Sequence, residues 1–441
     1  MDSTLAILGG KPAIDEQSVP ASLFHWPIIT QEDEEAALEV IRANKFSGTD
    51  ITIRFENEVA AWLGTRYAIA YCNGTMSLAA AMFGIGLGAG DEIICPTKTY
   101  WASITHAANL GATAVFCNVD GMLSMDPGDI ERCITDRTKA LMVVHYLAYP
   151  CDMDAIMAIA KKHGLKVIED VSHAQGGLYK GRRLGTFGDV GAMSMMSGKS
   201  FAAGELGMLV TDDRRIYERA MAYCHYERNN EKYIQESDEL KPFMHISLGG
   251  YKGRANQLCT AIGRVQLKYY DARCARIREA MNYFWDQLEG LPGIRAIRVD
   301  ESTGSNMAGW YCPHGRYYPE ELHGLSPERF CEALRAEGVK SRAGGNFCLH
   351  THNLFKTFDP NHSGSPARLA HSHRDAAELD DPCHPSTEKY CFSVPWFIEP
   401  DRAWIDQYAA AIRKVVEHHM QLLDSDREAA QDGRWYGTGN E

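Results

Sequence analysis

The feature that most constrains this chain is the alternation of short apolar runs with amphipathic stretches between residues 66 and 170. Short apolar runs predict buried strands, and apolar residues at spacings of three and four predict helices. The expected strands are 66–72, 91–96, 113–118, 140–146 and 166–170, and the expected helices are 75–85, 101–110, 129–133 and 153–163. This order predicts an α/β fold with a mostly parallel sheet and helices on both faces. Ligands in such sheets bind at the carboxyl ends of the strands.

The pattern changes after residue 261, where one long helical stretch, 264–288, is followed by short apolar runs and two more expected helices at 327–337 and 401–423. We therefore expect four parts: an N-terminal arm (1–30), a large α/β domain (31–263), a linking helix with a smaller α+β domain (264–425) and a polar tail (426–441). Residues 360–381 are rich in His, Ser, Asp and Pro and are expected to form a mobile loop.

Composition excludes several classes of protein. The 441 residues carry a formal net charge of −13 without clustered basic residues, which argues against a nucleic-acid partner. No run approaches the roughly 20 apolar residues of a membrane span, and residues 1–13 lack the pattern of a signal peptide. The 13 cysteines are scattered without a Cys-x-x-Cys motif, so we expect buried free thiols. The expectation is a cytoplasmic protein that does not associate with membranes.

Two motifs that suggest ligands are better explained without them. The glycine run from Gly84 to Gly90 follows an expected helix and precedes a strand, whereas a dinucleotide-binding loop follows a strand and opens a helix. The glycine run therefore predicts a helix end and a turn. The histidines at 350, 352, 371 and 373 stand in polar segments without a carboxylate or thiolate at a fixed helical spacing, so no metal site is expected.

The segment Asn73-Gly74-Thr75 has the order that suits an anion. A strand ends, a turn follows and an Ala-rich helix begins, so backbone N–H groups and the Thr75 hydroxyl would face a bound anion. A capping role for Thr75 explains the same residue equally well.

Asp170 and Lys199 are the two charged residues with a possible chemical role. Asp170 ends a buried strand, where a carboxylate needs a cationic partner, and a protonated pyridine nitrogen would be one. Lys199 follows an apolar run and lies among small residues, so a partly buried amine of lowered pKa is expected, suited to forming a Schiff base. Each signal taken alone also has a structural explanation.

Together these segments resemble the DegT/StrS family of aminotransferases, which use pyridoxal 5′-phosphate (PLP) and aminate keto-sugars and keto-cyclitols. The resemblance extends from residue 8 to about residue 271. The matching stretches are 8–13, 73–75, 88–96, 152–156, 168–170, 179–182, 185–189 and 250–256. The resemblance implies a fold-type I PLP transferase with a mostly parallel large domain and a smaller C-terminal domain.

The resemblance also implies roles for residues around the cofactor ring. Lys199 matches the Schiff-base lysine, and Asp170 matches the carboxylate that keeps the pyridine nitrogen protonated. His173 matches a side chain near the phenolic oxygen of the cofactor. Tyr100 matches the aromatic residue that stacks on the ring, with Trp101 as the alternative if the register differs by one.

At the phosphate the resemblance implies Gly74, Thr75, the backbone of Met76, and Ser194. Lys252 matches a position from which the partner subunit of a homodimer reaches the phosphate, where a cation would suit a dianion. The chain departs from the family at Leu206, where a glycine is usual, and across 346–395, the region expected to line the substrate pocket.

The implied reaction has two halves. An amino donor, glutamine or glutamate, converts the cofactor to pyridoxamine 5′-phosphate, and a ketone then accepts the amine, with Lys199 moving the proton in both halves. Relatives that dehydrate deoxysugars typically carry histidine in place of this lysine. Three alternatives remain open: such a dehydratase, a relative that aromatises an amino-cyclohexenone, and a PLP-fold sensor or assembly subunit without turnover.

Overall fold

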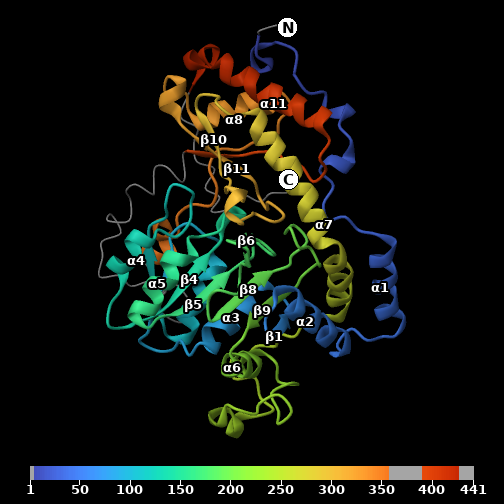
Figure 1. The fold of residues 1–441 in the computed structure, drawn as a ribbon, viewed down its shortest axis with the longest axis vertical. Helices are drawn as coiled ribbons and strands as arrows, with labels where there is room; N and C mark the ends of the chain where they lie inside the picture. The colour runs from blue at the N-terminus through green and yellow to red at the C-terminus, as the bar shows by residue number, and fades with distance from the viewer. Residues whose placement is uncertain (1–3, 357–389, 427–441) are drawn as a thin grey trace.

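The computed structural model describes residues 4–356 and 390–426. Figure 1 shows a large lower body built on one sheet and a smaller upper body, with the long helix α7 running from one to the other. The expected loop at 360–381, His371, His373 and the tail from residue 427 lie outside the described residues.

The large body contains a seven-stranded sheet in the order β1-β9-β8-β5-β4-β2-β3. β3, β2, β4, β5 and β8 run parallel, and β9 runs antiparallel to both of its neighbours, β8 and β1. The strands are β1 (Tyr67–Tyr71), β2 (Glu92–Pro96), β3 (Thr113–Cys117), β4 (Thr138–Val144), β5 (Lys166–Asp170), β8 (Val190–Ser194) and β9 (Gly207–Thr211), with a separate hairpin of β6 (Leu178–Tyr179) and β7 (Arg182–Arg183). The predicted α/β class with a mostly parallel sheet is confirmed.

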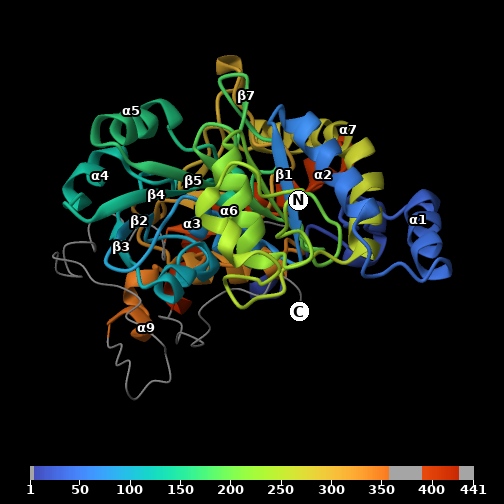
Figure 2. The same ribbon diagram turned by 90° about the horizontal axis from the view of Figure 1, so that it is seen from below.

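Helices cover both faces of this sheet, as Figure 2 shows from below. Successive residues of one strand alternate between faces: Ile93 packs into the core under α3 and α6, whereas Ile94 packs into the core under α4 and α5. The helices of the large body are α1 (Gln31–Arg42), α2 (Asp50–Leu63), α3 (Gly74–Gly84), α4 (Pro127–Cys133), α5 (Met153–His163) and α6 (Arg214–Cys224). Burial on both faces explains why the strands are apolar throughout.

Local chemistry explains where the expected elements match and where they differ. α5 has the expected bounds because Asp152 caps its first turn, accepting from the Ala155 N–H at 3.2 Å, and Gly164 ends it at φ 67°. The helix expected at 101–110 is instead two 3-10 segments, Trp101–Ser103 and Thr105–Leu110, separated by Ile104 at φ −136°.

α7 (Gln257–Gln287) begins earlier than the expected 264 because Asn256 caps it, accepting from the Leu258 N–H at 2.9 Å. The boundary expected at residue 263 therefore falls inside one continuous helix. The glycine run does form a helix end and a turn: α3 ends at Gly84, and Gly86 and Gly90 have φ of 84° and 86°.

The smaller body has an antiparallel sheet in the order β10-β11-β12. Its elements are β10 (Ile294–Ala296), β11 (His314–Tyr317), α8 (Pro327–Ala336), β12 (Cys391–Ser393) and α11 (Arg402–Glu417). The short helix α9 (Asn353–Lys356) packs instead on the large body, where the Phe355 ring contacts that of Phe116 in β3. The N-terminal segment lies against this body (Figure 1), where the Glu337 carboxylate accepts from the N–H groups of Ala6 and Ala13 at 2.8 and 2.9 Å. Among the described helices, none is long and apolar enough to cross a membrane.

Candidate active site

Several of the residues singled out from the sequence lie at the carboxyl ends of neighbouring strands. Asp170 ends β5 and Ser194 ends β8, and these strands pair in parallel with Asp170 opposite Ala192. Lys199 follows β8 in the chain, and α3 begins three residues after the end of β1. The edge of the sheet thus brings Asp170, Ser194 and Lys199 together, as expected for a ligand site in this class of fold.

The Asp170 carboxylate is buried, with 4% of the residue exposed. It accepts from the Ser103 hydroxyl at 2.8 Å and from the Ser172 N–H at 3.0 Å. Ser103 in turn shares a hydrogen bond of 2.9 Å with the Thr99 hydroxyl. A carboxylate has about four acceptor positions, so these two donors leave room for a further one.

Ser103 was not identified from the sequence. Its only signal was a position in the segment that follows an expected strand. It lies on the turn after β2, which is separated from β5 by β4, so only the sheet order brings its hydroxyl to Asp170.

Lys199 is partly buried, and its amine faces several groups of different chemistry. Burial lowers the pKa of Lys199 to about 8, against the opposing effect of the Asp170 carboxylate and the Cys312 thiol. The amine lies 4.3 Å from the centre of the Tyr311 ring. A lowered pKa leaves more of the amine neutral near pH 7, which suits a nucleophile.

His173 is held as a neutral imidazole. Its Nδ1 accepts from the Leu147 N–H at 3.2 Å, which leaves the proton on Nε2. Burial, together with the nearby Lys199 and His314, holds the pKa of His173 well below its usual value. Its ring lies 5.4 Å from that of Tyr146 and 4.7 Å from that of Tyr311. His173 can therefore donate a hydrogen bond from Nε2.

The start of α3 packs tightly against the end of β8. Asn73, not Thr75, caps the helix, because its side chain accepts from the Met76 N–H at 2.9 Å. A Cβ on Gly74 would lie 2.5 Å from the Ser194 Cβ, so only glycine fits there. The Met76 N–H is thus engaged within the protein, and the N–H groups of Gly74 and Thr75 are those that helix geometry leaves without an intrahelical acceptor.

Tyr100 and Lys252 are both exposed. Tyr100 lies with 38% of its surface exposed beside Trp101, and their ring centres are 4.9 Å apart. Lys252 has its amine 5.9 Å from the ring of Tyr226. The next residue, Gly253, accepts from the Cys72 N–H at 2.8 Å, so this segment lies beside the end of β1.

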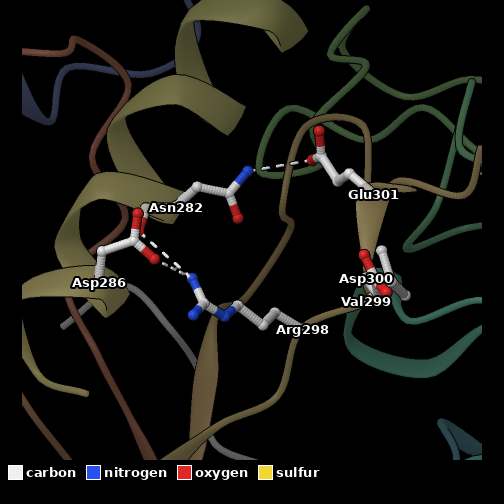
Figure 3. A pocket seen from close by; sticks show the side chains of 6 residues that line it. All are labelled: Asn282, Asp286, Arg298, Val299, Asp300 and Glu301. Carbon is white, nitrogen blue, oxygen red and sulfur yellow. Dashed lines mark hydrogen bonds and ion pairs between the residues drawn. The ribbon is translucent and has the colours of Figure 1, made fainter. Parts of the chain in front are cut away.

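A separate cavity lies away from these residues. It has a volume of about 470 Å³ and lies between α7 and the segment after β10 (Figure 3). Arg298 pairs with Asp286 at 2.6 Å, and Asn282 donates to Glu301 at 3.0 Å, so its polar groups satisfy one another. Its lining includes none of the residues singled out from the sequence.

The histidines considered as metal ligands have other described contacts. The ring of His350 is hydrogen-bonded to the Thr97 hydroxyl, and the Nδ1 of His352 accepts from the Leu354 N–H at 3.0 Å. Within residues 4–356 and 390–426, no group of three or more possible ligands gathers.

Comparison with known proteins shows which family the chain resembles. Residues 27–389 match the model of the DegT/DnrJ/EryC1/StrS aminotransferase family. The GDP-perosamine synthase of Escherichia coli O157:H7 is 35% identical over 62% of this chain and 73% of its own length. The L-glutamine:scyllo-inosose aminotransferase of Streptomyces griseus is 30% identical over 96% of this chain and 100% of its own length. The crystal structure of 3-amino-5-hydroxybenzoic acid synthase shares the fold, with a TM-score of 0.75 at 23% identity over 90% of this chain and 98% of its own. The resemblance seen in the sequence is confirmed, and the chain belongs to the DegT/DnrJ/EryC1/StrS aminotransferase family.

Proposed function

We propose that this aminotransferase moves an amino group from glutamine or glutamate to a ketone of a sugar, cyclitol or related intermediate, using PLP bound by Lys199. The observation that carries the proposal is the convergence of Lys199, the Asp170 carboxylate and the start of α3 at one edge of the sheet. Relatives named as a GDP-perosamine synthase and an L-glutamine:scyllo-inosose aminotransferase support the donor and the class of ketone.

The residues present fit the cofactor at three points. Asp170 retains acceptor capacity for a ring nitrogen, and Lys199 offers an amine of lowered pKa for an aldehyde. The glycine at 74 lets the start of α3 approach Ser194 closely, which gathers first-turn N–H groups and a hydroxyl at the seat of a phosphate. When bound, PLP supplies an aldehyde that carries the amino group and a ring that withdraws electrons from the reacting carbon.

Each side chain then has a distinct task. Asp170 holds the proton on the ring nitrogen, and Lys199 carries a proton to and from the reacting carbon. With its Nδ1 engaged by the Leu147 N–H, His173 would donate from Nε2 to an oxygen of the bound cofactor. Tyr100 would lie against the cofactor ring, and Thr75, Ser194 and the backbone of Gly74 would bind the phosphate. The Met76 N–H would contribute only if it left Asn73.

The oligomeric part of the proposal is a homodimer that shares its sites. Lys252 is exposed on its own subunit and lies beside the end of β1, at the phosphate end of the candidate site. We propose that it reaches the phosphate in the partner subunit.

The assignment of Lys199 is tested by reduction of the cofactor-loaded protein with borohydride, followed by peptide mapping. The label should be found on Lys199, and Lys199→Ala should lose both the label and amino transfer. Lys180→Ala is the matched control, because Lys180 is an exposed lysine paired with Asp154, and it should behave as the wild type. A label on another lysine would show that the proposed site is wrong.

The substrates are tested separately with the same protein. A screen of amino donors, followed by a screen of ketones, should change the cofactor absorbance in opposite directions. Absorbance that no donor changes would favour a binding or assembly role without turnover.

A further inference from the structure

The Lys199 amine faces an aromatic ring that comes from the smaller body. The Tyr311 ring centre lies 4.3 Å from the Lys199 Nζ, within the range in which an ammonium is attracted to the electron-rich face of a ring. Tyr311 also contacts His173 edge-on at 4.7 Å. One ring therefore touches two of the residues that the proposed function assigns to the cofactor.

The backbone on both sides of Tyr311 is strained. Ala308, Trp310 and Cys312 have φ of 44°, 49° and 56°, the left-handed region that residues other than glycine rarely adopt. Three such residues within five positions persist only where the surroundings impose the conformation. We call residues 307–312 the strap.

The strap is pressed against the loop that holds Lys199. A Cβ on Gly309 would lie 2.5 Å from the Ser200 Cβ, so the two backbones approach as closely as glycine permits. The Gly309 carbonyl accepts from the Trp396 indole N–H at 2.9 Å. The strap thus packs directly against Ser200, the residue that follows Lys199, and is anchored by Trp396.

A second indole fixes Lys199 itself. Trp26 donates from its indole N–H to the Lys199 carbonyl oxygen at 2.8 Å. The rings of Trp26 and Trp396 lie 5.3 Å apart, so the two anchors support each other. The main chain of Lys199 is held by Trp26, while its side chain faces Tyr311.

The other described groups that face the amine act in different directions. Asp170 favours the protonated amine, as does the Cys312 thiol, and burial opposes it. His173 is neutral and adds no charge. The ring face of Tyr311 is therefore a separate source of stabilisation for the ammonium, alongside the Asp170 carboxylate.

We infer that Tyr311 is a positioning residue for Lys199: the face of its ring holds the free lysine ammonium in place, and its hydroxyl is not required. This inference rests on the proposed function, in which Lys199 leaves the cofactor and later rejoins it. While it is free, its amine must be held close to the site. The contact itself is a property of the protein without cofactor.

The test measures the pKa of Lys199 in the full-length protein after hydroxylamine treatment and dialysis have removed any bound carbonyl compound. Trace acetylation at a series of pH values, followed by peptide mass spectrometry, gives the reactivity of Lys199 relative to that of the other lysines. Tyr311→Phe keeps the ring face and should match the wild type. Tyr311→Leu removes it and should lower the pKa of Lys199 by about half a unit to one unit.

The matched control is Tyr318→Leu. Tyr318 also lies in the smaller body and has a cationic neighbour, with Arg295 5.3 Å from its ring centre, so its loss should leave Lys199 unchanged. Equal pKa values in Tyr311→Leu and the wild type would overturn the inference. A shift in Tyr311→Phe as large as that in Tyr311→Leu would assign the effect to the hydroxyl and overturn it as well.

A third variant covers the case in which Tyr311→Leu does not fold. Pentafluorophenylalanine at position 311 keeps the shape of phenylalanine and reverses the charge distribution of the ring face. It should lower the pKa of Lys199 relative to Tyr311→Phe, and an unchanged value would overturn the inference. None of these measurements involves cofactor or substrate. Failure of the borohydride labelling would therefore contradict the proposed function, whereas the effect of Tyr311 on the pKa of Lys199 would still stand.

Discussion

The buried Asp170 carboxylate is hydrogen-bonded within the protein and still has acceptor positions for a ligand. Burial of a carboxylate is costly unless hydrogen bonds replace its water. Here the Ser103 hydroxyl and the Ser172 N–H supply two bonds. In the part of the chain that the structure describes, the Lys199 amine and Asp170 influence each other without a hydrogen bond or ion pair between them. The carboxylate is thus oriented while it retains acceptor capacity for a protonated ring nitrogen.

The role of this charge predicts the effect of Asp170→Asn. A neutral amide cannot keep the ring nitrogen protonated, so we expect cofactor binding to persist and amino transfer to fall by several orders of magnitude, as in other variants with a misplaced proton. Steady-state rates and cofactor absorbance measure the two effects. Ser103→Ala keeps the carboxylate and should lose about tenfold or less, on the scale of one hydrogen bond. Activity of Asp170→Asn within about tenfold of the wild type would leave Asp170 with a structural role only.

At the scale of elements, the close contact between α3 and β8 fixes the geometry of the proposed phosphate site. Gly74→Ala should destabilise the protein by about 1–3 kcal/mol, the usual cost of overpacking, because the added methyl would lie 2.5 Å from the Ser194 Cβ. Gly88→Ala is the matched control, since a Cβ there meets no atom within 4 Å. Urea unfolding measures both variants. Equal stability of the two would mean that α3 and β8 can separate without cost.

The segment between β2 and β3 predicts a dependence of stability on pH. Burial lowers the pKa of His106 from 6.5 to about 4, and its ring is hydrogen-bonded to the Tyr223 hydroxyl at 2.7 Å. Between these pH values the unfolded chain binds a proton that the folded chain does not. The contribution to stability is therefore present above pH 6.5 and is lost as the pH falls toward 4.

The measurement compares the free energy of unfolding at pH 7 and pH 5. His106 alone should account for about 2 kcal/mol of the fall in the free energy of unfolding between pH 7 and pH 5. The fall in His106→Gln should therefore be smaller than that in the wild type by this amount. His163→Gln removes an exposed histidine, and its free energy of unfolding should fall by the same amount as that of the wild type. An identical loss in His106→Gln and the wild type would show that His106 does not take part.

At the scale of the whole molecule, the candidate site draws on distant parts of the chain. Around Lys199 of the large body, Trp26 from the N-terminal arm binds the backbone carbonyl, and Tyr311 from the smaller body faces the amine. Asp170 of the large body acts on the same amine. A change in how the smaller body sits on the sheet would alter the surroundings of Lys199. The proposed homodimer adds Lys252 from a second copy.

Subunit mixing tests the shared site. Lys252→Ala should weaken cofactor binding, because it removes a cation proposed to neutralise the phosphate. If that contact is made across the dimer, mixing Lys252→Ala with Lys199→Ala subunits should give heterodimers with one complete site and restore activity. Exchange of subunits, shown by native mass spectrometry, without restored activity would assign Lys252 to an ordinary surface turn.

The sequence by itself determined the class of fold and the bounds of elements such as β5 and α5, and it singled out Asp170 and Lys199 as candidates. Periodicity, capping residues and strand ends are local properties, so they can be recognised without knowledge of distant contacts. The family resemblance supplied the aminotransferase activity, which the comparisons confirm. The roles of all the site residues stay predictions: Gly74, Thr75, Met76, Tyr100, Asp170, His173, Ser194, Lys199 and Lys252.

Only the tertiary structure decided which hydroxyl supports Asp170 and which ring faces Lys199. Ser103 reaches Asp170 because the sheet order places β2 two strands from β5, and Tyr311 reaches Lys199 because the strap crosses from the smaller body. Capping by Asn73 likewise determined that the Met76 N–H is engaged within the protein. These contacts join residues far apart in the chain or choose between adjacent donors, and such choices depend on packing, which no local pattern encodes.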